Sequence, residues 1–310
     1  MTDTRSITGI HHITAISGPP GGNVAFFTGP MRQRLVKKTV NFDDPGTYHL
    51  YYGDQGGAPG SILTFFPFEG AAPGRPGPGM ASAYAYAVAP GTIETWRDGL
   101  AARGIGTAAL EERFGETVLT VRDPDNAPVE IVESDRVKGV DPDGFHSVTL
   151  WLDDPEPTAR LLTGVFGFEE AGAERGEGRE RLRFAAPGEA RGALVDLLRT
   201  DDAPRGVPGA GTIHHVAFRA TDDADQLEWR ARLTQAGFGV TPVIDRQYFN
   251  AIYFREPGGV LFEIATDPPG FAVDEPLADL GGSLKLPPKY EAYRAQIEAA
   301  LPALPALETV

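Results

Sequence analysis

The feature that most constrains the fold of this chain is an internal repeat. The order strand, helix, strand, strand, strand occurs four times, with a period of about 65 residues. In the last copy, an apolar strand at 212–220 leads into an amphipathic helix at 222–236, which ends at Gly237. Three further strands are predicted at 239–244, 249–255 and 260–265. The repeat therefore predicts an α+β fold made of four βαβββ modules.

The other three modules extend over residues 10–66, 82–133 and 144–198, and their predicted helices are 22–31, 92–103 and 155–165. The curled sheet of a single module has exposed edges, which are covered when modules pair. We therefore expect two domains of two modules each, at 1–135 and 136–270, with each concave sheet forming a cup for a small ligand. Residues 271–310 lie outside the repeat as a C-terminal extension, in which 287–301 has the apolar spacing of a helix.

Composition argues against several classes of partner. The net charge of −15 argues against nucleic acid and anionic membrane surfaces, because both bind positively charged patches. No apolar run approaches the roughly 20 residues that span a bilayer, and the first residues lack the apolar region of a signal peptide. The absence of cysteine excludes disulfides and thiolate metal ligands. We therefore expect a globular, cytoplasmic protein with no nucleic acid and no membrane partner.

Two histidine pairs stand at equivalent positions in the first strands of the first and fourth modules. They are His11-His12 and His214-His215, and they use four of the six histidines of the chain. The last strand of the fourth module carries Glu263 among apolar residues, where a carboxylate is costly unless it is paired or binds a metal. Because side chains alternate along a strand, only one histidine of each pair can share a face with Glu263. Two imidazoles and one carboxylate form the ligand set of non-haem Fe(II) oxygenases.

The two middle modules lack this ligand set. Alignment of the repeats places Ala85 and Ser147 where the outer modules have the second histidine of a pair, and Glu130 where the fourth module has Glu263. Serine, alanine and a single carboxylate cannot bind a metal strongly. We therefore expect one metal per chain and a structural role for Glu130.

Two assignments of the ligands remain open. His12, His215 and Glu263 come from the first and fourth modules, which must then share one cup. His146, His215 and Glu263 instead follow the order and approximate spacing of catechol-type extradiol dioxygenases, whose ligands all lie in one half of the chain. However, His146 aligns with the first histidine of each pair rather than the second, which favours the set with His12.

The motifs around these residues resemble those of hydroquinone ring-cleaving dioxygenases. These enzymes are the para-diol branch of the extradiol dioxygenases, within the vicinal oxygen chelate superfamily of glyoxalases, bleomycin-resistance proteins and dioxygenases. The similar segments are Ile10 to Thr14, Tyr48 to Tyr51, Thr212 to His215 and Tyr253 to Glu263, and the similarity extends into the tail from Gly270. The resemblance implies two vicinal-oxygen-chelate domains, and it implies Fe(II) bound by His12, His215 and Glu263, with Mn(II) or Zn(II) as substitutes in a purified sample.

The resemblance also implies which side chains line the pocket, namely His11, Thr14, His214, Arg246 and Tyr253. Thr14, Arg246 and Tyr253 would bind the substrate. Tyr253, His11 or His214 could move a proton to or from the substrate, and Arg246 could stabilise developing negative charge. The expected function is Fe(II)-dependent cleavage of a hydroquinone-type or other phenolic ring, with the aromatic substrate and O2 as partners and homo-oligomerisation left open.

Two functions of other classes fit the same cup. A glyoxalase-like lyase or isomerase would use Zn, Ni or Co as a Lewis acid without O2. Such chemistry usually needs a further carboxylate, for which Glu130 is the only candidate that the repeat supplies. A non-catalytic binding protein, for example one that sequesters a drug, could use the fold without a metal, although the two histidine pairs and Glu263 argue against it.

Overall fold

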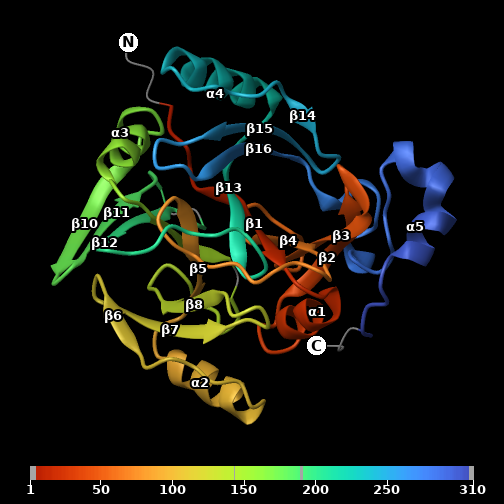
Figure 1. Cartoon of the computed structure of the whole chain (residues 1–310), viewed down its shortest axis with the longest axis horizontal. Coiled ribbons are helices and arrows are strands. Elements are labelled where there is room, and N and C mark those ends of the chain that lie inside the picture. Colours follow the sequence, from red (N-terminus) through yellow and green to blue (C-terminus); the bar gives the residue numbers. More distant parts are fainter. Residues whose placement is uncertain (1–4, 143, 189–190, 307–310) are drawn as a thin grey trace.

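The computed structural model describes residues 5–142, 144–188 and 191–306. Residues 1–4 and 307–310, the ends of the predicted N-terminal domain and C-terminal extension, lie outside the described residues. The strands form two curled sheets of eight strands each, which lie against each other with the helices on their outer sides (Figure 1). The α+β fold predicted from the repeat is therefore confirmed.

The first sheet contains the strands of the first and fourth modules. These are β1 (Ile10–Ser17), β2 (Arg34–Asn41), β3 (Asp44–Gly53), β4 (Ile62–Pro67), β13 (Thr212–Ala220), β14 (Ile244–Asp245), β15 (Phe249–Arg255) and β16 (Leu261–Pro269). Their order is β14-β15-β16-β13-β1-β4-β3-β2, so β1 and β13 meet at the centre as an antiparallel pair. The first and fourth modules thus share one cup, as the assignment of His12 as a ligand requires.

The second sheet contains the strands of the two middle modules. These are β5 (Met80–Val88), β6 (Glu111–Arg113), β7 (Glu116–Arg122), β8 (Pro128–Glu133), β9 (Phe145–Trp151), β10 (Glu169–Gly176), β11 (Arg179–Ala185) and β12 (Leu194–Thr200). The antiparallel pair β5 and β9 holds its centre. Each sheet therefore takes one module from 1–135 and one from 136–270.

The four module helices lie within three residues of the predicted ranges. They are α1 (Pro20–Thr28), α2 (Ile93–Ala102), α3 (Glu156–Gly164) and α4 (Asp223–Gln235). The side chain of Asp222 caps α4 by accepting a hydrogen bond from the backbone N–H of Asp225, and Trp229 and Leu233 form its buried face. No helix in the described part of the chain is long and apolar enough to cross a membrane.

Two local predictions need correction. The strand predicted at 239–244 is reduced to Ile244–Asp245, because Pro242 has no N–H to donate to a neighbouring strand. The helix predicted at 287–301 is a 3₁₀ helix, Pro288–Tyr293, followed by α5 (Arg294–Ala300), which lies beside β2 and β3 in Figure 1. Short 3₁₀ turns are frequent at the N-terminal ends of α-helices, so the segment is helical in the predicted place but begins with tighter turns.

A buried ion cluster attaches the C-terminal extension to the first sheet. Lys37 on β2 is fully buried, and its Nζ lies 2.6 Å from Asp274 Oδ1 and 2.5 Å from Glu275 Oε2. The ring of Phe271 packs beside those of Tyr51 and Tyr248, with centroids 5.1 Å away in each case. The extension therefore supports, from behind, a tyrosine that lines the cup.

Candidate metal centre

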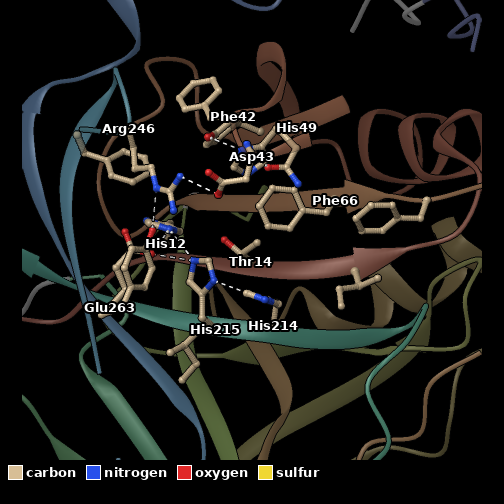
Figure 2. A pocket seen from close by; sticks show the side chains of 17 residues that line it. His12, Thr14, Phe42, Asp43, His49, Phe66, His214, His215, Arg246 and Glu263 are labelled. Atoms are coloured by element: carbon tan, nitrogen blue, oxygen red, sulfur yellow. Dashed lines mark hydrogen bonds and ion pairs between the residues drawn. The ribbon is translucent and has the colours of Figure 1, made fainter. Parts of the chain in front are cut away.

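Three buried side chains from distant parts of the chain meet at the bottom of the first cup (Figure 2). His12 Nε2 lies 3.3 Å from His215 Nε2. Glu263 Oε2 lies 2.9 Å from His215 Nε2 and 3.5 Å from His12 Nε2. All three candidate ligand atoms lie within 4.8 Å of one another, so a single metal ion can touch all of them.

Strand register explains why these side chains meet. Ala217 on β13 lies opposite His12 on β1 and beside Glu263 on β16, which brings both side chains to the same place in the sheet. The β1–β13 ladder skips His11 on one strand and His214 on the other, so each is the extra residue of a β-bulge. The ligand candidate follows the bulge directly on both strands.

The bulges bring the two histidines of each pair into contact, which simple alternation along a strand does not predict. His11 Nδ1 lies 2.9 Å from His12 Nδ1, and His214 Nδ1 lies 2.8 Å from His215 Nδ1. A metal bound at Nε2 of His12 or His215 would leave the proton of that ring on Nδ1, from which it would donate to the preceding histidine. Burial lowers the pKa of His11 well below its usual value, so a neutral His11 can accept this bond. Burial also lowers the pKa of His214 to about 4, so a neutral His214 can accept the corresponding bond from His215.

The donor set fits a cation better than it fits any protein group nearby. Glu263 is fully buried, and the imidazoles of His12 and His215 hold its pKa well below its usual range in spite of that burial. Within the described part of the chain, neither carboxylate oxygen of Glu263 has a hydrogen-bond donor in suitable geometry. An ionised, buried carboxylate with two imidazole nitrogens beside it but no well-aligned donor among the described residues is costly, and a metal ion would satisfy it.

A cavity of about 460 Å³ opens above the cluster, a size that suits a small organic ligand. One wall, from β3, β4 and the turn before β3, carries Phe42, His49, Tyr51, Phe66 and Phe68. The opposite wall, from β13 to β16, carries His214, Arg246, Phe249, Tyr253 and Leu261. Figure 2 shows Thr14 between the two walls, beside His215.

The structure brings most of the expected pocket residues together. Thr14, His214, Arg246 and Tyr253 line the cavity with the three ligand candidates. His11 instead lies behind His12, against Phe249 and 2% exposed, so the expected proton transfer between His11 and a substrate does not fit its position. The bulge turns its ring toward His12 rather than toward the cavity.

Arg246 joins the two sides of the cavity mouth. Its Nε lies 3.2 Å from the hydroxyl of Tyr253, and its Nη1 lies 3.2 Å from Asp43 Oδ2 in the turn between β2 and β3. Burial, together with the charge of Glu263, raises the pKa of Tyr253 well above its usual value. Tyr253 therefore keeps its proton and acts as a hydrogen-bond donor rather than as a base.

Sequence reasoning assigned no role to Asp43, His49 or Tyr51. His49 and Tyr51 lie in the segment Tyr48 to Tyr51, which resembles the family motif, and are two positions apart on one strand. That spacing places both side chains on one face, and this was the available indication that they face the cup.

The second cup is filled by ion pairs. Arg113 Nη1 donates to Glu130 Oε1 at 2.7 Å, which agrees with the structural role expected for Glu130. His146 bonds Glu116 and Ser147 in this sheet, so the rival ligand set of His146, His215 and Glu263 is not assembled. His146 is also the extra residue of a bulge, like His11 and His214.

The register corrects one alignment made from the repeats. In the β5–β9 ladder the bulge residues are Ser82 and His146, so the positions that follow them are Ala83 and Ser147. Ala83, rather than Ala85, is therefore the counterpart of a ligand histidine. Ala85 instead lies beside Glu130, as Ala217 lies beside Glu263. The shift of two residues arises because the bulge on β5 precedes the position that sequence comparison chose.

Comparison with known proteins agrees with this geometry. Residues 144–264 match the sequence model of the Glyoxalase/Bleomycin resistance protein/Dioxygenase superfamily. A protein of Bacillus subtilis (strain 168) named as the ring-cleaving dioxygenase MhqO is 47% identical over 308 residues, which cover 96% of each chain. The chain belongs to the ring-cleaving dioxygenase family of this superfamily.

Other members of the family and the wider superfamily extend the comparison. A crystal structure of a dioxygenase from Bacillus subtilis subsp. subtilis str. 168 superposes with a TM-score of 0.91 and 45% identity, covering 99% of this chain and 100% of the other. The chlorohydroquinone/hydroquinone 1,2-dioxygenase of Sphingobium indicum is 33% identical over 313 residues, covering 94% and 95%. Glyoxalase I from Zea mays, at 13% identity and a TM-score of 0.63 over 84% and 92%, shares the two-domain vicinal oxygen chelate fold alone.

Proposed function

We propose that this protein is a non-haem Fe(II)-dependent dioxygenase that opens a hydroquinone-type or other phenolic ring with O2. The observation that carries the proposal is the convergence of His12, His215 and Glu263 beneath a cavity with aromatic walls. Two neutral imidazoles and one carboxylate leave exchangeable positions on the metal, as in non-haem Fe(II) oxygenases. Bound there, Fe(II) would supply the redox chemistry that links the ring and O2.

The side chains of the cavity suit an ionised phenol. Arg246 and the protonated hydroxyl of Tyr253 lie together on one wall, where they can stabilise negative charge on a ring oxygen. His214 lines the cavity and, with a pKa of about 4 caused by burial, is neutral near pH 7 and available for proton transfer. Phe66 and Phe249 offer flat apolar surfaces to the ring itself.

The hydroquinone class is favoured by the relatives as well as by the cavity. One relative is named as a chlorohydroquinone/hydroquinone 1,2-dioxygenase and covers nearly the whole chain. The glyoxalase-like alternative needs a further carboxylate near the metal. Its candidate, Glu130, lies in the second sheet and is held by Arg113.

The proposal is tested by reconstitution with Fe(II) under anaerobic conditions, followed by addition of O2 and hydroquinone. We expect one O2 to be consumed per ring opened, as measured with an oxygen electrode and by loss of the ring absorbance. Zn(II), which has no redox chemistry, should bind the same site without supporting turnover. Equal turnover with Zn(II) in the absence of O2 would refute the dioxygenase and favour a Lewis-acid reaction.

A further inference from the structure

A chain of four hydrogen-bonding side chains lines one side of the cup. Thr14 Oγ1 lies 2.9 Å from Thr64 Oγ1, and Thr64 Oγ1 lies 2.8 Å from His49 Nε2. His49 Nδ1 in turn lies 2.8 Å from the hydroxyl of Tyr51. The register explains the chain, because Thr64 on β4 lies beside Thr14 on β1 and opposite Tyr51 on β3. In each of these bonds either atom could be the donor, so the donors are fixed by the groups at the ends of the chain.

Tyr51 sets the direction of the chain. Its hydroxyl is buried, and its hydrogen-bond partner among residues 5–142, 144–188 and 191–306 is His49 Nδ1. Burial raises the pKa of Tyr51 well above its usual value, so the hydroxyl keeps its proton and donates it to Nδ1. Burial also lowers the pKa of His49 well below its usual value, so this ring is neutral and has a single proton. With Nδ1 accepting, that proton is on Nε2.

The remaining bonds follow from this tautomer. His49 Nε2–H donates to the oxygen of Thr64, so the hydroxyl hydrogen of Thr64 points to its other partner, Thr14. The oxygen of Thr14 is then an acceptor for Thr64, and its own hydrogen is left for the cavity. We propose that the chain Tyr51–His49–Thr64–Thr14 makes Thr14 a fixed hydrogen-bond donor to an oxygen anion bound in the cup, beside His12 and His215. The identification of that anion as the ionised hydroxyl of the ring substrate rests on the proposed function.

The second cup provides an internal comparison. Register places Thr149, Asp196, Arg181 and Arg183 at the positions that correspond to Thr14, Thr64, His49 and Tyr51. There the two arginines bind Asp196, and Arg181 also bonds Thr149, so the hydroxyl acts as an acceptor within an ion cluster. An uncharged chain that ends in a free donor occurs in the cup with the ligand candidates. Chains of this kind strengthen their terminal donor by mutual polarisation.

The first test reads the tautomer of His49 directly and needs neither substrate nor turnover. The Zn(II)-loaded protein, labelled with ¹⁵N-histidine, is studied by NMR, and the signal of His49 is assigned by its loss in His49→Gln. We expect a neutral ring with the proton on Nε2, and a weaker preference for that tautomer in Tyr51→Phe. A proton on Nδ1 would overturn the proposal, because the whole chain would then run the other way.

The second test measures the donor with 4-nitrophenol, whose ionised form absorbs visible light. With Zn(II)-loaded protein, Thr14→Val should bind the phenolate roughly tenfold more weakly, the typical effect of losing one bond to a charged group. Thr14→Val should also raise the pH at which the bound phenol ionises. Thr14→Ser, which keeps a hydroxyl, should have the binding affinity and the ionisation pH of the unsubstituted protein. Tyr51→Phe should weaken phenolate binding and raise the ionisation pH of the bound phenol, as Thr14→Val does.

Tyr52→Phe is the matched control. Tyr52 is a buried neighbour on β3 whose hydroxyl bonds Asn23 instead, so its loss should leave nitrophenol binding unchanged. An unchanged ionisation pH in Thr14→Val, or no binding of nitrophenol to the unsubstituted protein, would overturn the proposed anion site. Normal binding of nitrophenol by a protein that fails to consume O2 with Fe(II) would instead refute the proposed function alone.

Discussion

Replacement of Glu263 by Gln should abolish the thermal stabilisation that a metal gives to this protein. A ligand at a concentration 100-fold above its dissociation constant stabilises the folded state by about 2.7 kcal/mol. The entropy of unfolding of 310 residues is about 0.65 kcal/mol per kelvin, so the melting temperature should rise by about 4 °C. Gln has nearly the shape of Glu but supplies no charge, and Glu263 supplies the only negative charge of the cluster.

The loss of stabilisation in Glu263→Gln follows from the expected loss of metal affinity. Substitutions of groups that merely orient a metal ligand reduce metal affinity by roughly 10- to 100-fold, so loss of a ligand should cost at least 100-fold. At the same metal concentration the remaining stabilisation is then about 0.4 kcal/mol, or less than about 1 °C. The assay is calorimetry with and without Zn(II), together with analysis of the metal content of the desalted protein.

Glu130→Gln is the matched control, because register places Glu130 at the position that corresponds to Glu263 in the second sheet. This variant should melt at a lower temperature without metal, since it weakens the buried pair with Arg113. It should nevertheless retain the full shift of about 4 °C on addition of Zn(II). A normal shift in Glu263→Gln, or loss of the shift in Glu130→Gln, would refute the assignment of the metal site.

Three further perturbations test other parts of the structure. Tyr253→Phe should lower the rate of O2 consumption by roughly 100-fold, as loss of an oxyanion donor does, while leaving the metal content intact. An unchanged rate would mean that Tyr253 has no role in the reaction. Burial raises the pKa of Asp123 from its usual value near 4 to about 6, so the folded state loses stability as the pH rises from about 4 to about 6, and the loss is complete above that range. Asp123→Asn should therefore be up to about 3 kcal/mol more stable than the unsubstituted protein in urea unfolding at pH 8, but not at pH 4. Lys37→Met removes the cation from the buried carboxylate of Glu275, which keeps its hydrogen bonds from Ser283 and Gly281. It should cost up to about 3–5 kcal/mol, a fall of up to about 5–8 °C in the calorimetric melting temperature, and no fall would mean that this pair does not stabilise the extension.

The repeat predicted the architecture well because each module buries its apolar face in the same way. The helices and most strands follow from periodicity, and Gly237 and Asp222 mark the ends of α4 within one or two residues. The strand at 239–244 was wrong because one proline outweighed the apolar pattern around it. The prediction that the first and fourth modules share a sheet came from the histidine pairs rather than from the strand pattern, because only this arrangement places both pairs in one cup.

The parts of the site that sequence could not predict depend on bulges and on residues from different modules. Alternation assigns His11 to the opposite face from His12, whereas the bulge brings the two rings into contact. Asp43 reaches Arg246 across the mouth of the cavity from a turn, and no sequence period connects these residues. The chain from Tyr51 to Thr14 needs three neighbouring strands in register, so it appears only in the folded protein.

Comparison of the two cups distinguishes what the backbone contributes to a metal site from what individual side chains contribute. Both central ladders keep a bulge on each strand, with three paired positions between the bulges, so the backbone of a metal site persists in the second sheet. Ala83 and Ser147 follow those bulges and could therefore carry the missing imidazoles, with Glu130 as the third ligand.

The double replacement Ala83→His and Ser147→His should nevertheless bind no second metal. Arg113 already donates to Glu130 at 2.7 Å, so a cation would have to displace a buried guanidinium from its carboxylate. Addition of Arg113→Ala to the double variant frees Glu130, and titration with Zn(II) should then give two equivalents per chain instead of one. Two tight equivalents in the double variant would mean that the ion pair does not block the site, and that loss of the two histidines alone explains why the second cup differs.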